Sequence, residues 1–254
     1  MSDSYNHVFG QCVNPLNRAL ISGGSSGGEG SIVSARGSIL GIGTDIGGSI
    51  RIPAALCGLY SLMPGSGRHP YERKGLKQDI VRPIAGPLAT SLASIEAYMQ
   101  ALPEAKPWEE DPFIYPLPWR TERCSLPVAQ KLRIGFVLDD GVVKPQPPVT
   151  RAVKEVITAL RAAGHEVFEW DAKSHGYAYQ LWEKAILSDG GVACQKLCDM
   201  TGEPLIEGML VGKAKDILTT EQTHQVYCPF SPPESYLMNC TLLTEIVELL
   251  VDYR

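Results

Sequence analysis

The chain lacks the features that mark nucleic-acid-binding, secreted or membrane-spanning proteins. Its net charge is -5 at pH 7, and no long basic run offers a footprint for nucleic acid. Residues 1–10 hold neither a basic region nor an apolar core, so no signal peptide is evident. The most apolar stretch, residues 237–251, is interrupted by polar and acidic residues and falls short of a membrane span. We therefore expect a cytoplasmic protein with no nucleic-acid partner and no membrane span.

Cysteine is present but forms no recognisable framework. The seven cysteines are an odd number and are scattered, which is typical of a reducing compartment. Cys194 and Cys198 are one helical turn apart, but no Cys or His pair nearby completes a zinc spacing. We expect free thiols, no metal and no cofactor.

Hydrophobic periodicity predicts an α/β fold. Residues 131–171 follow a strand–helix–strand pattern that implies a parallel pairing, with Gly164 just after the helix. Before this unit, the predicted order is irregular chain over 1–22, helix 29–36, strand 38–43, helix 50–57, strand 59–63, a loop-rich stretch 64–90, and helix 92–102 capped by Ser91. After it, helices are predicted over 176–188, 190–200, 204–218 and 233–252. The whole is expected to be a single domain, 1–254, with a mixed, largely parallel sheet covered by helices.

The most informative feature is a pair of glycine-dense turns that carry serines. The first, Gly23–Gly30, contains Ser25 and Ser26. The second, Gly43–Arg51, contains Ser49 directly after two glycines. Glycine loses much conformational entropy on folding. Two such glycine clusters around hydroxyl groups therefore indicate a backbone conformation that serves a function.

The second turn has the composition of an oxyanion hole beside a nucleophile. The backbone N–H groups of Ile46, Gly47, Gly48 and Ser49 can converge on one point, where they would stabilise a negative oxygen. Ser49 would place its hydroxyl beside that point as the nucleophile. The alternative is a tight strand-to-helix connection whose glycines only permit close packing.

A serine nucleophile needs a group that accepts its proton. The five histidines show no spacing that ties one of them to Ser49. Ser–Lys arrangements are a known alternative to the Ser–His–Asp triad. A relay from Ser49 through Ser25 to a lysine therefore fits the residues better than a histidine triad.

Two other glycine motifs fit less well. A nucleophile elbow needs a glycine where Arg51 stands. A phosphate-binding P-loop needs a lysine where Glu29 stands, and a carboxylate would repel phosphate. The hypothesis that the chain binds phosphate or a nucleotide therefore rests on its glycine density alone.

The two turns resemble the signature of the amidase signature family. The segments are Gly23-Gly24-Ser25-Ser26-Gly27-Gly28-Glu29-Gly30 and Gly41-Ile42-Gly43-Thr44-Asp45-Ile46-Gly47-Gly48-Ser49-Ile50-Arg51-Ile52-Pro53. The branch most similar is that of the fungal acetamidases and fatty-acid amide hydrolases. The likeness is strong over about 6–102, weaker over 131–171, and leaves 175–254 as a helical remainder.

The resemblance implies amide hydrolysis through an acyl-serine intermediate. Ser49 would be the nucleophile and Ser25 the proton-relaying serine, preceded by a cis peptide bond. Ile46 to Ser49 would form the oxyanion hole, with Ser26 contacting substrate. Thr44, Asp45 and Arg51 would hold the loop. A small-molecule amide is the expected partner. The sequence is compatible with a homo-oligomer but contains no pattern that indicates one.

One departure from the family concerns its lysine. The family carries this residue in a Lys-Asp motif well before the first serine pair, whereas the first lysine here is Lys74. The chain is therefore expected to be truncated at both ends. The alternative to an active hydrolase is a catalytically impaired remnant that binds small molecules.

Overall fold

The computed structural model describes residues 3–71, 81–121, 131–206, 211–227 and 250–251, and it divides into two compact units. Unit 1 comprises Met1–Arg120 and Ile186–Leu218, and unit 2 comprises Thr121–Ala185 and Thr219–Arg254. Each unit is described by itself, and a single domain over the whole chain stays a prediction.

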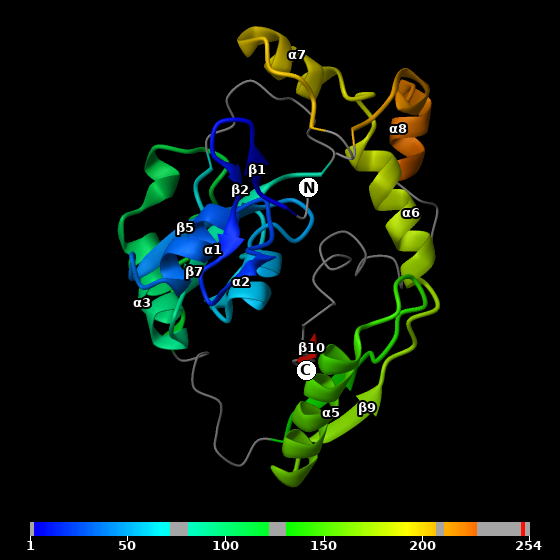
Figure 1. Ribbon diagram of the computed structural model, residues 1–254. Helices are drawn as coiled ribbons and strands as arrows, with labels where there is room; N and C mark the ends of the chain where they lie inside the picture. The colour runs from blue at the N-terminus through cyan, green and yellow to red at the C-terminus, as the bar shows by residue number, and fades with distance from the viewer. Residues whose placement is uncertain (1–2, 72–80, 122–130, 207–210, 228–249, 252–254) are drawn as a thin grey trace. The chain divides into compact units, whose positions relative to one another are not determined.

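Unit 1 is built around a three-stranded sheet with the order β5-β7-β6. Helices α1, α2 and α3 accompany it, drawn in blue, cyan and green in Figure 1. The bounds are α1 Gly27–Ser34, β5 Leu40–Asp45, α2 Arg51–Cys57, β6 Tyr60–Ser61, β7 Ile84–Ala89 and α3 Leu92–Glu104, followed by the 3-10 turn η1 Pro107–Glu109. The serine-bearing turns lie at the start of α1 and between β5 and α2.

Strand β7 corrects the prediction that residues 64–90 are loop throughout. It is the middle strand and pairs antiparallel with both neighbours, although it contains Gly86 and Pro87. Pro87 lies opposite Ile42 in a pair that makes no ladder hydrogen bond. The missing N–H of Pro87 therefore removes no hydrogen bond between β7 and β5. A Cβ on Gly86 would overlap the Leu62 carbonyl oxygen, so this glycine permits close strand packing.

The first residues also differ from the expected irregular chain. They form two short antiparallel pairs, β1 with β2 and β3 with β4. The bounds are β1 Tyr5–Asn6, β2 Gly10–Gln11, β3 Val13–Asn14 and β4 Asn17–Ile21. The turn signals around Asn14-Pro15 were recognised, but strands this short carry too little alternation to be predicted.

The helix ends of unit 1 follow the sequence closely. Ser91 caps α3 by accepting a hydrogen bond from the Ser94 amide at 3.1 Å, as predicted. Helix α2 ends before Gly58, which has φ +66° and so adopts the left-handed conformation that glycine favours. Two apolar clusters support these helices: Ile50, Ala54 and Leu88 with Leu59, and Ala89, Ile95 and Met99 with Tyr98, Leu102 and Trp119.

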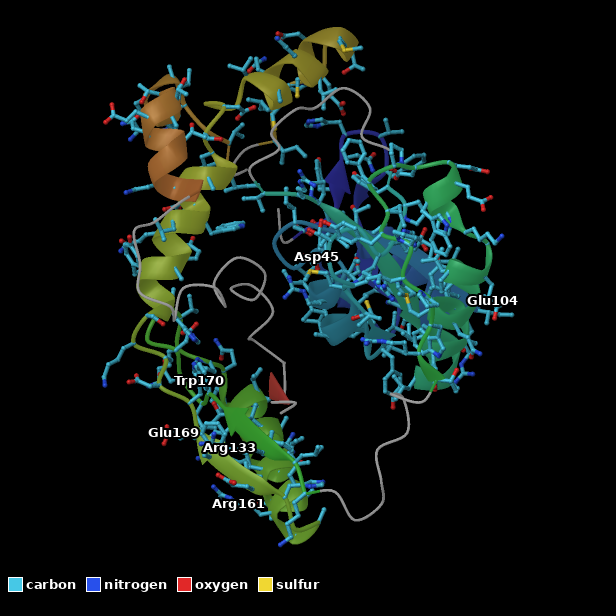
Figure 2. All side chains as sticks on the ribbon, turned by 180° about the vertical axis from the view of Figure 1, so that it is seen from behind. Asp45, Glu104, Arg133, Arg161, Glu169 and Trp170 are labelled. Atoms are coloured by element: carbon cyan, nitrogen blue, oxygen red, sulfur yellow. The ribbon has the colours of Figure 1, made fainter. Side chains whose placement is uncertain are left out.

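Unit 2 confirms the predicted strand–helix–strand motif. Strands β8 Arg133–Phe136 and β9 Glu166–Glu169 are parallel, and α5 Pro147–Ala162 connects them. Gly164 lies just beyond the helix with φ +88°, where the sequence placed it. Strand β10, Leu250–Val251, pairs antiparallel with β8. Figure 2 labels Arg133 and Trp170 on the β8–β9 strands and the chain that follows them.

The helical remainder is predicted only in part. The expected helices 176–188 and 190–200 correspond to α6 His175–Ile186 and α7 Val192–Thr201. The predicted helix 204–218 is wrong in the described residues, which hold only the 3-10 turn η2 Ala214–Asp216 before α8 Thr220–Tyr227. The predicted helix 233–252 lies mostly outside the described residues, and its described part is β10.

The α/β class and the mixed character of the sheets are confirmed. The expected excess of parallel pairs is not seen in the described parts of the chain, where only β8 and β9 run parallel. The middle strand β7 is antiparallel to both β5 and β6, so these two outer strands run in the same direction without pairing with each other. None of the helices within the described ranges is both long and apolar enough to cross a membrane.

Candidate functional site

The two serine-bearing turns meet at a backbone hydrogen bond. The Ser26 amide at the start of α1 donates to the Ser49 carbonyl oxygen at 3.2 Å. This contact joins segments that the chain separates by a helix and a strand. The structure therefore brings together the predicted nucleophile Ser49 and the neighbour of the predicted relay residue Ser25.

Ser26 also fastens the end of β5 through its side chain. Its hydroxyl accepts a hydrogen bond from the Thr44 amide at 3.0 Å and donates to the Thr44 carbonyl at 3.2 Å. The prediction placed Ser26 in contact with substrate. The structure shows its hydroxyl bound to the backbone of Thr44, so both the contact of Ser26 with substrate and the role of Thr44 in holding the loop stay predictions.

Asp45 anchors the loop that carries Ser49. Its buried carboxylate accepts hydrogen bonds from the amides of Gly48 at 2.6 Å and Ile50 at 3.0 Å. It also pairs with Arg51, whose Nε lies 3.0 Å from Oδ2 and whose Nη2 lies 3.1 Å from Oδ1. Figure 2 labels Asp45 within unit 1. The expected role of Asp45 and Arg51 in holding this loop agrees with these contacts.

The charge of Asp45 is maintained by these partners. Burial by itself raises the pKa of the Asp45 carboxyl, because it disfavours the charged form. The hydrogen bonds from Arg51, Gly48 and Ile50, together with the positive charge of Arg51, outweigh burial and hold the pKa below its usual value. The carboxylate therefore stays ionised at neutral pH and keeps its hold on the loop.

The same contacts bear on the predicted oxyanion donors. The Gly48 N–H donates to Asp45 within the loop, and its role toward a substrate oxygen stays a prediction. Ile46, Gly47 and Ser49 donate no backbone hydrogen bond to any part of the chain that the structure describes. Their amides remain the predicted donors.

The two predicted catalytic serines differ in exposure. Ser25 is exposed, whereas Ser49 is buried with 8% of its surface accessible. The peptide bond between Gly24 and Ser25 is cis, as the resemblance implied. Ser4, which sequence reasoning missed, bridges this turn: its hydroxyl donates to the Ser25 carbonyl at 2.9 Å and accepts from the Gly27 amide at 3.0 Å. No motif surrounds Ser4, so nothing along the chain pointed to its role.

The histidines with described contacts are engaged elsewhere. His69 Nε2 lies 2.7 Å from the Tyr98 hydroxyl, and its Nδ1 lies 2.7 Å from the Pro70 carbonyl. His7 Nε2 lies 3.2 Å from the Pro204 carbonyl. These contacts agree with the inference that histidine is not the base beside Ser49.

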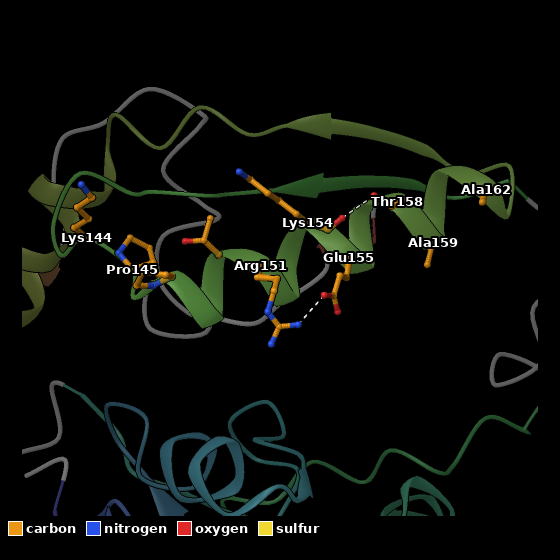
Figure 3. A pocket seen from close by; sticks show the side chains of 10 residues that line it. Lys144, Pro145, Arg151, Lys154, Glu155, Thr158, Ala159 and Ala162 are labelled. Carbon is orange, nitrogen blue, oxygen red and sulfur yellow. Dashed lines mark hydrogen bonds and ion pairs between the residues drawn. The ribbon is translucent and has the colours of Figure 1, made fainter.

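Unit 2 has a hollow that none of the predicted site residues lines. It runs along one side of α5, where Arg151 pairs with Glu155 at 2.7 Å (Figure 3). Its lining residues are Lys144, Pro145, Pro147, Thr150, Arg151, Lys154, Glu155, Thr158, Ala159 and Ala162. It is open, and its threonines and charged side chains are those of an ordinary solvated helix face.

Known proteins resemble this chain over most of its length. Acetamidase of Aspergillus oryzae is 39% identical over 213 residues, which are 80% of this chain and 39% of that protein. Fatty-acid amide hydrolase 1 of Sus scrofa is 36% identical over 195 residues, which are 74% of this chain and 33% of that protein. The chain thus spans about two fifths or less of the length of these curated relatives.

Solved structures share the fold. A fatty acid amide hydrolase superposes with a TM-score of 0.83 at 35% identity, over 90% of this chain and 41% of that chain. A bacterial aryl acylamidase of the amidase signature family superposes with a TM-score of 0.66 at 22% identity, over 93% and 47%. The family model described as Amidase matches residues 1–227. The expected resemblance is confirmed, and the chain belongs to the amidase family.

Proposed function

We propose that this chain carries the acyl-transfer site of an amidase-type carbon–nitrogen hydrolase. The supporting observation is the junction of the two serine turns, in which the Ser26 amide binds the Ser49 carbonyl while Asp45 anchors the other side of the loop. Such a junction holds a hydroxyl and several amides in a fixed arrangement, as acyl transfer requires. Relatives named acetamidase and fatty-acid amide hydrolase favour a small carboxamide as substrate.

In the proposed reaction Ser49 Oγ attacks the carbonyl carbon of the amide. The Ser49 proton passes to Ser25 Oγ, and the Ser25 proton passes to a base. The carbonyl oxygen becomes negative and is stabilised by the amides of Ile46, Gly47 and Ser49. The carbon–nitrogen bond then breaks, the amine leaves with a proton returned through Ser25, and water hydrolyses the acyl-serine to a carboxylate and free Ser49.

The proposed base is a lysine, and none of the residues before Ser25 is a lysine in this sequence. General-base catalysis contributes roughly 100- to 10,000-fold to the rate. A Ser–Ser–Lys site that loses this base is therefore expected to acylate its serine more slowly by a factor of that order.

A fluorophosphonate probe tests the proposal, because it reacts covalently with an activated serine. We expect the wild-type chain to be labelled at Ser49, and the Ser49→Ala variant to lose that label. Ser61→Ala, in β6, is the matched control and should be labelled like wild type. Equal labelling of wild type and Ser49→Ala would remove Ser49 as nucleophile. No label on a folded wild-type chain would contradict the proposed function.

A further inference from the structure

Ser26 occupies the N-cap position of α1 without capping the helix. A serine at this position ordinarily accepts a hydrogen bond from the second or third amide of the helix. The Ser26 side chain makes no such bond. The amide of Gly27 is satisfied by the Ser4 hydroxyl instead. The Ser26 hydroxyl is thus committed to Thr44 in β5 rather than to its own helix.

This hydroxyl takes the place of a neighbouring strand. Among the described residues β5 is an outer strand that pairs only with β7. The N–H and C=O of a strand residue point to the same side, and those of Thr44 both bind Ser26 Oγ, away from β7. One side chain therefore satisfies both backbone groups of Thr44. We call this pair of hydrogen bonds the Ser26 clamp.

The Ser26 clamp requires that residue 43, which precedes Thr44 in β5, has no side chain. A Cβ on Gly43 would lie 2.8 Å from Ser26 Oγ and 3.0 Å from Ser26 Cβ, closer than real side chains approach without a shift. It would also lie 2.9 Å from Leu88 Cδ1, the movable end of a side chain. The φ angle of Gly43 is not in the left-handed region, so space rather than backbone conformation explains why glycine stands here.

We propose that Gly43 is a positioning residue for the acyl-transfer site, acting through Ser26. Without a side chain at 43, Ser26 can bind Thr44 with its hydroxyl and Ser49 with its amide at the same time. Residue 26 follows Ser25 directly, so displacing it changes the placement of Ser25 relative to Ser49. The catalytic part of this inference rests on the proposed function, whereas the Ser26 clamp is independent of it.

A double-mutant cycle with Gly43→Ala and Ser26→Gly tests the inference. Ser26→Gly removes the two Ser26 atoms that the new methyl group would meet and leaves only the contact with the movable end of Leu88. In Gly43→Ala, hydrogen exchange of the Thr44 amide should accelerate by about five- to tenfold, the factor that corresponds to losing one ordinary hydrogen bond. Ser26→Gly should accelerate it to a similar degree, and the double variant should exchange no faster than Ser26→Gly alone. Additive effects, or an unchanged Thr44 amide in Gly43→Ala, would overturn the role of Gly43.

Labelling of Ser49 by the fluorophosphonate probe supplies the catalytic readout. The labelling rate should fall by about tenfold or more in Gly43→Ala, measured well below its unfolding temperature. Gly28→Ala, in α1, is the control: no atom lies within 4 Å of a Cβ there, so exchange and labelling should stay unchanged. If wild type is not labelled, the proposed function fails while the exchange cycle still decides the role of Gly43. If exchange follows the expected pattern but labelling in Gly43→Ala equals wild type, the positioning role is refuted.

Discussion

The two units use strand glycines in opposite ways. In unit 1, Cβ atoms on Gly43 of β5 and Gly86 of β7 would meet a serine hydroxyl and a carbonyl oxygen that already occupy their places. In unit 2, a Cβ on Gly135 of β8 would lie 3.4 Å from the Phe168 ring, an ordinary van der Waals contact. In the sheet of unit 1, backbone and hydroxyl atoms occupy the space where side chains of residues 43 and 86 would lie. In the sheet of unit 2, the space beside Gly135 would allow ordinary side-chain packing.

Charge pairs show the same contrast. The Asp45–Arg51 pair is nearly enclosed, with side-chain exposures of 0% and 19%, and it also binds the backbone. The Arg133–Glu166 pair in unit 2 has exposures of 54% and 64%. Charges withdrawn from water depend on each other far more than charges that water can solvate. The polar groups of unit 1 are therefore expected to dominate the response to substitution.

The largest effect is expected from Asp45→Asn. Removing the carboxylate charge leaves Arg51 short of its partner and weakens the bonds to Gly48 and Ile50, so we expect a loss of about 3 kcal/mol in the free energy of unfolding. Urea denaturation monitored by far-UV circular dichroism measures it. A loss below about 1 kcal/mol would show that the loop is held by packing instead.

Lowering the pH should show how far the stability of the wild-type protein depends on the Asp45 carboxylate. The native pKa of Asp45 lies below its usual value of 3.8, so the unfolded chain binds this proton more readily. The contribution of Asp45 is fully present above the usual value and is lost as the pH falls through the lowered native value. Stability measured between pH 5 and about pH 2.5 should therefore decline less steeply in Asp45→Asn than in wild type.

A smaller effect on stability, which distinguishes the two sheets directly, is expected from a pair of glycine substitutions. Gly86→Ala should cost about 2 kcal/mol, because the new methyl group overlaps the Leu62 carbonyl in the middle of the sheet. Gly135→Ala should be neutral or stabilising by up to about 1 kcal/mol, because the new methyl group makes only ordinary van der Waals contacts and alanine restricts the unfolded chain. Thermal unfolding compares the two variants. Equal costs would erase the distinction between the sheets.

His69 should give a modest pH effect in unit 1. Burial lowers its pKa from the usual 6.5, although the bond to the Pro70 carbonyl opposes the shift. Stability is then full above the usual value and decreases as the pH falls from 6.5 toward the lowered native value. His69→Gln should reduce the difference in melting temperature between pH 7.5 and pH 5.5. An unchanged difference would mean that other groups cause the dependence.

The smallest effect is expected from Glu166→Gln in unit 2. Both partners of the ion pair with Arg133 are exposed, so the change should cost less than about 0.5 kcal/mol. High salt should reduce even this difference, since exposed charges are screened. Chemical denaturation at low and high ionic strength measures it. A cost near that of Asp45→Asn would contradict the contrast between the two pairs.

The two units also differ in what the sequence could predict. In unit 2, β8, α5 and β9 follow simple periodicity, and Gly164 marks the helix end, so the motif was predicted with its parallel pairing. In unit 1, β7 was missed because Gly86 and Pro87 are turn signals in isolation. Only the register with β5, a long-range property, shows that both residues fit a middle strand.

For the candidate site, the sequence located the turns but not every contact within them. Glycine and serine spacing identified both turns, and the resemblance to the amidase signature implied that Asp45 and Arg51 hold the loop, where the two side chains form an ion pair. The engagement of Ser26 with Thr44 and of the Gly48 amide with Asp45 was not predicted. Both depend on which way a small polar group turns after folding, and spacing along the chain does not specify this.

The outer edge of β5 has a consequence for self-association. Exposed strand edges recruit strands from other molecules and so begin aggregation. Here serine hydroxyls already occupy the outward positions on either side of Ile42: Ser26 binds Thr44, and Ser38 Oγ donates to the Leu40 carbonyl at 2.7 Å. An incoming strand would have to displace both hydroxyls before its ladder could extend past Ile42. The hydroxyl that binds Thr44 is therefore also expected to hinder the addition of a foreign strand at this edge.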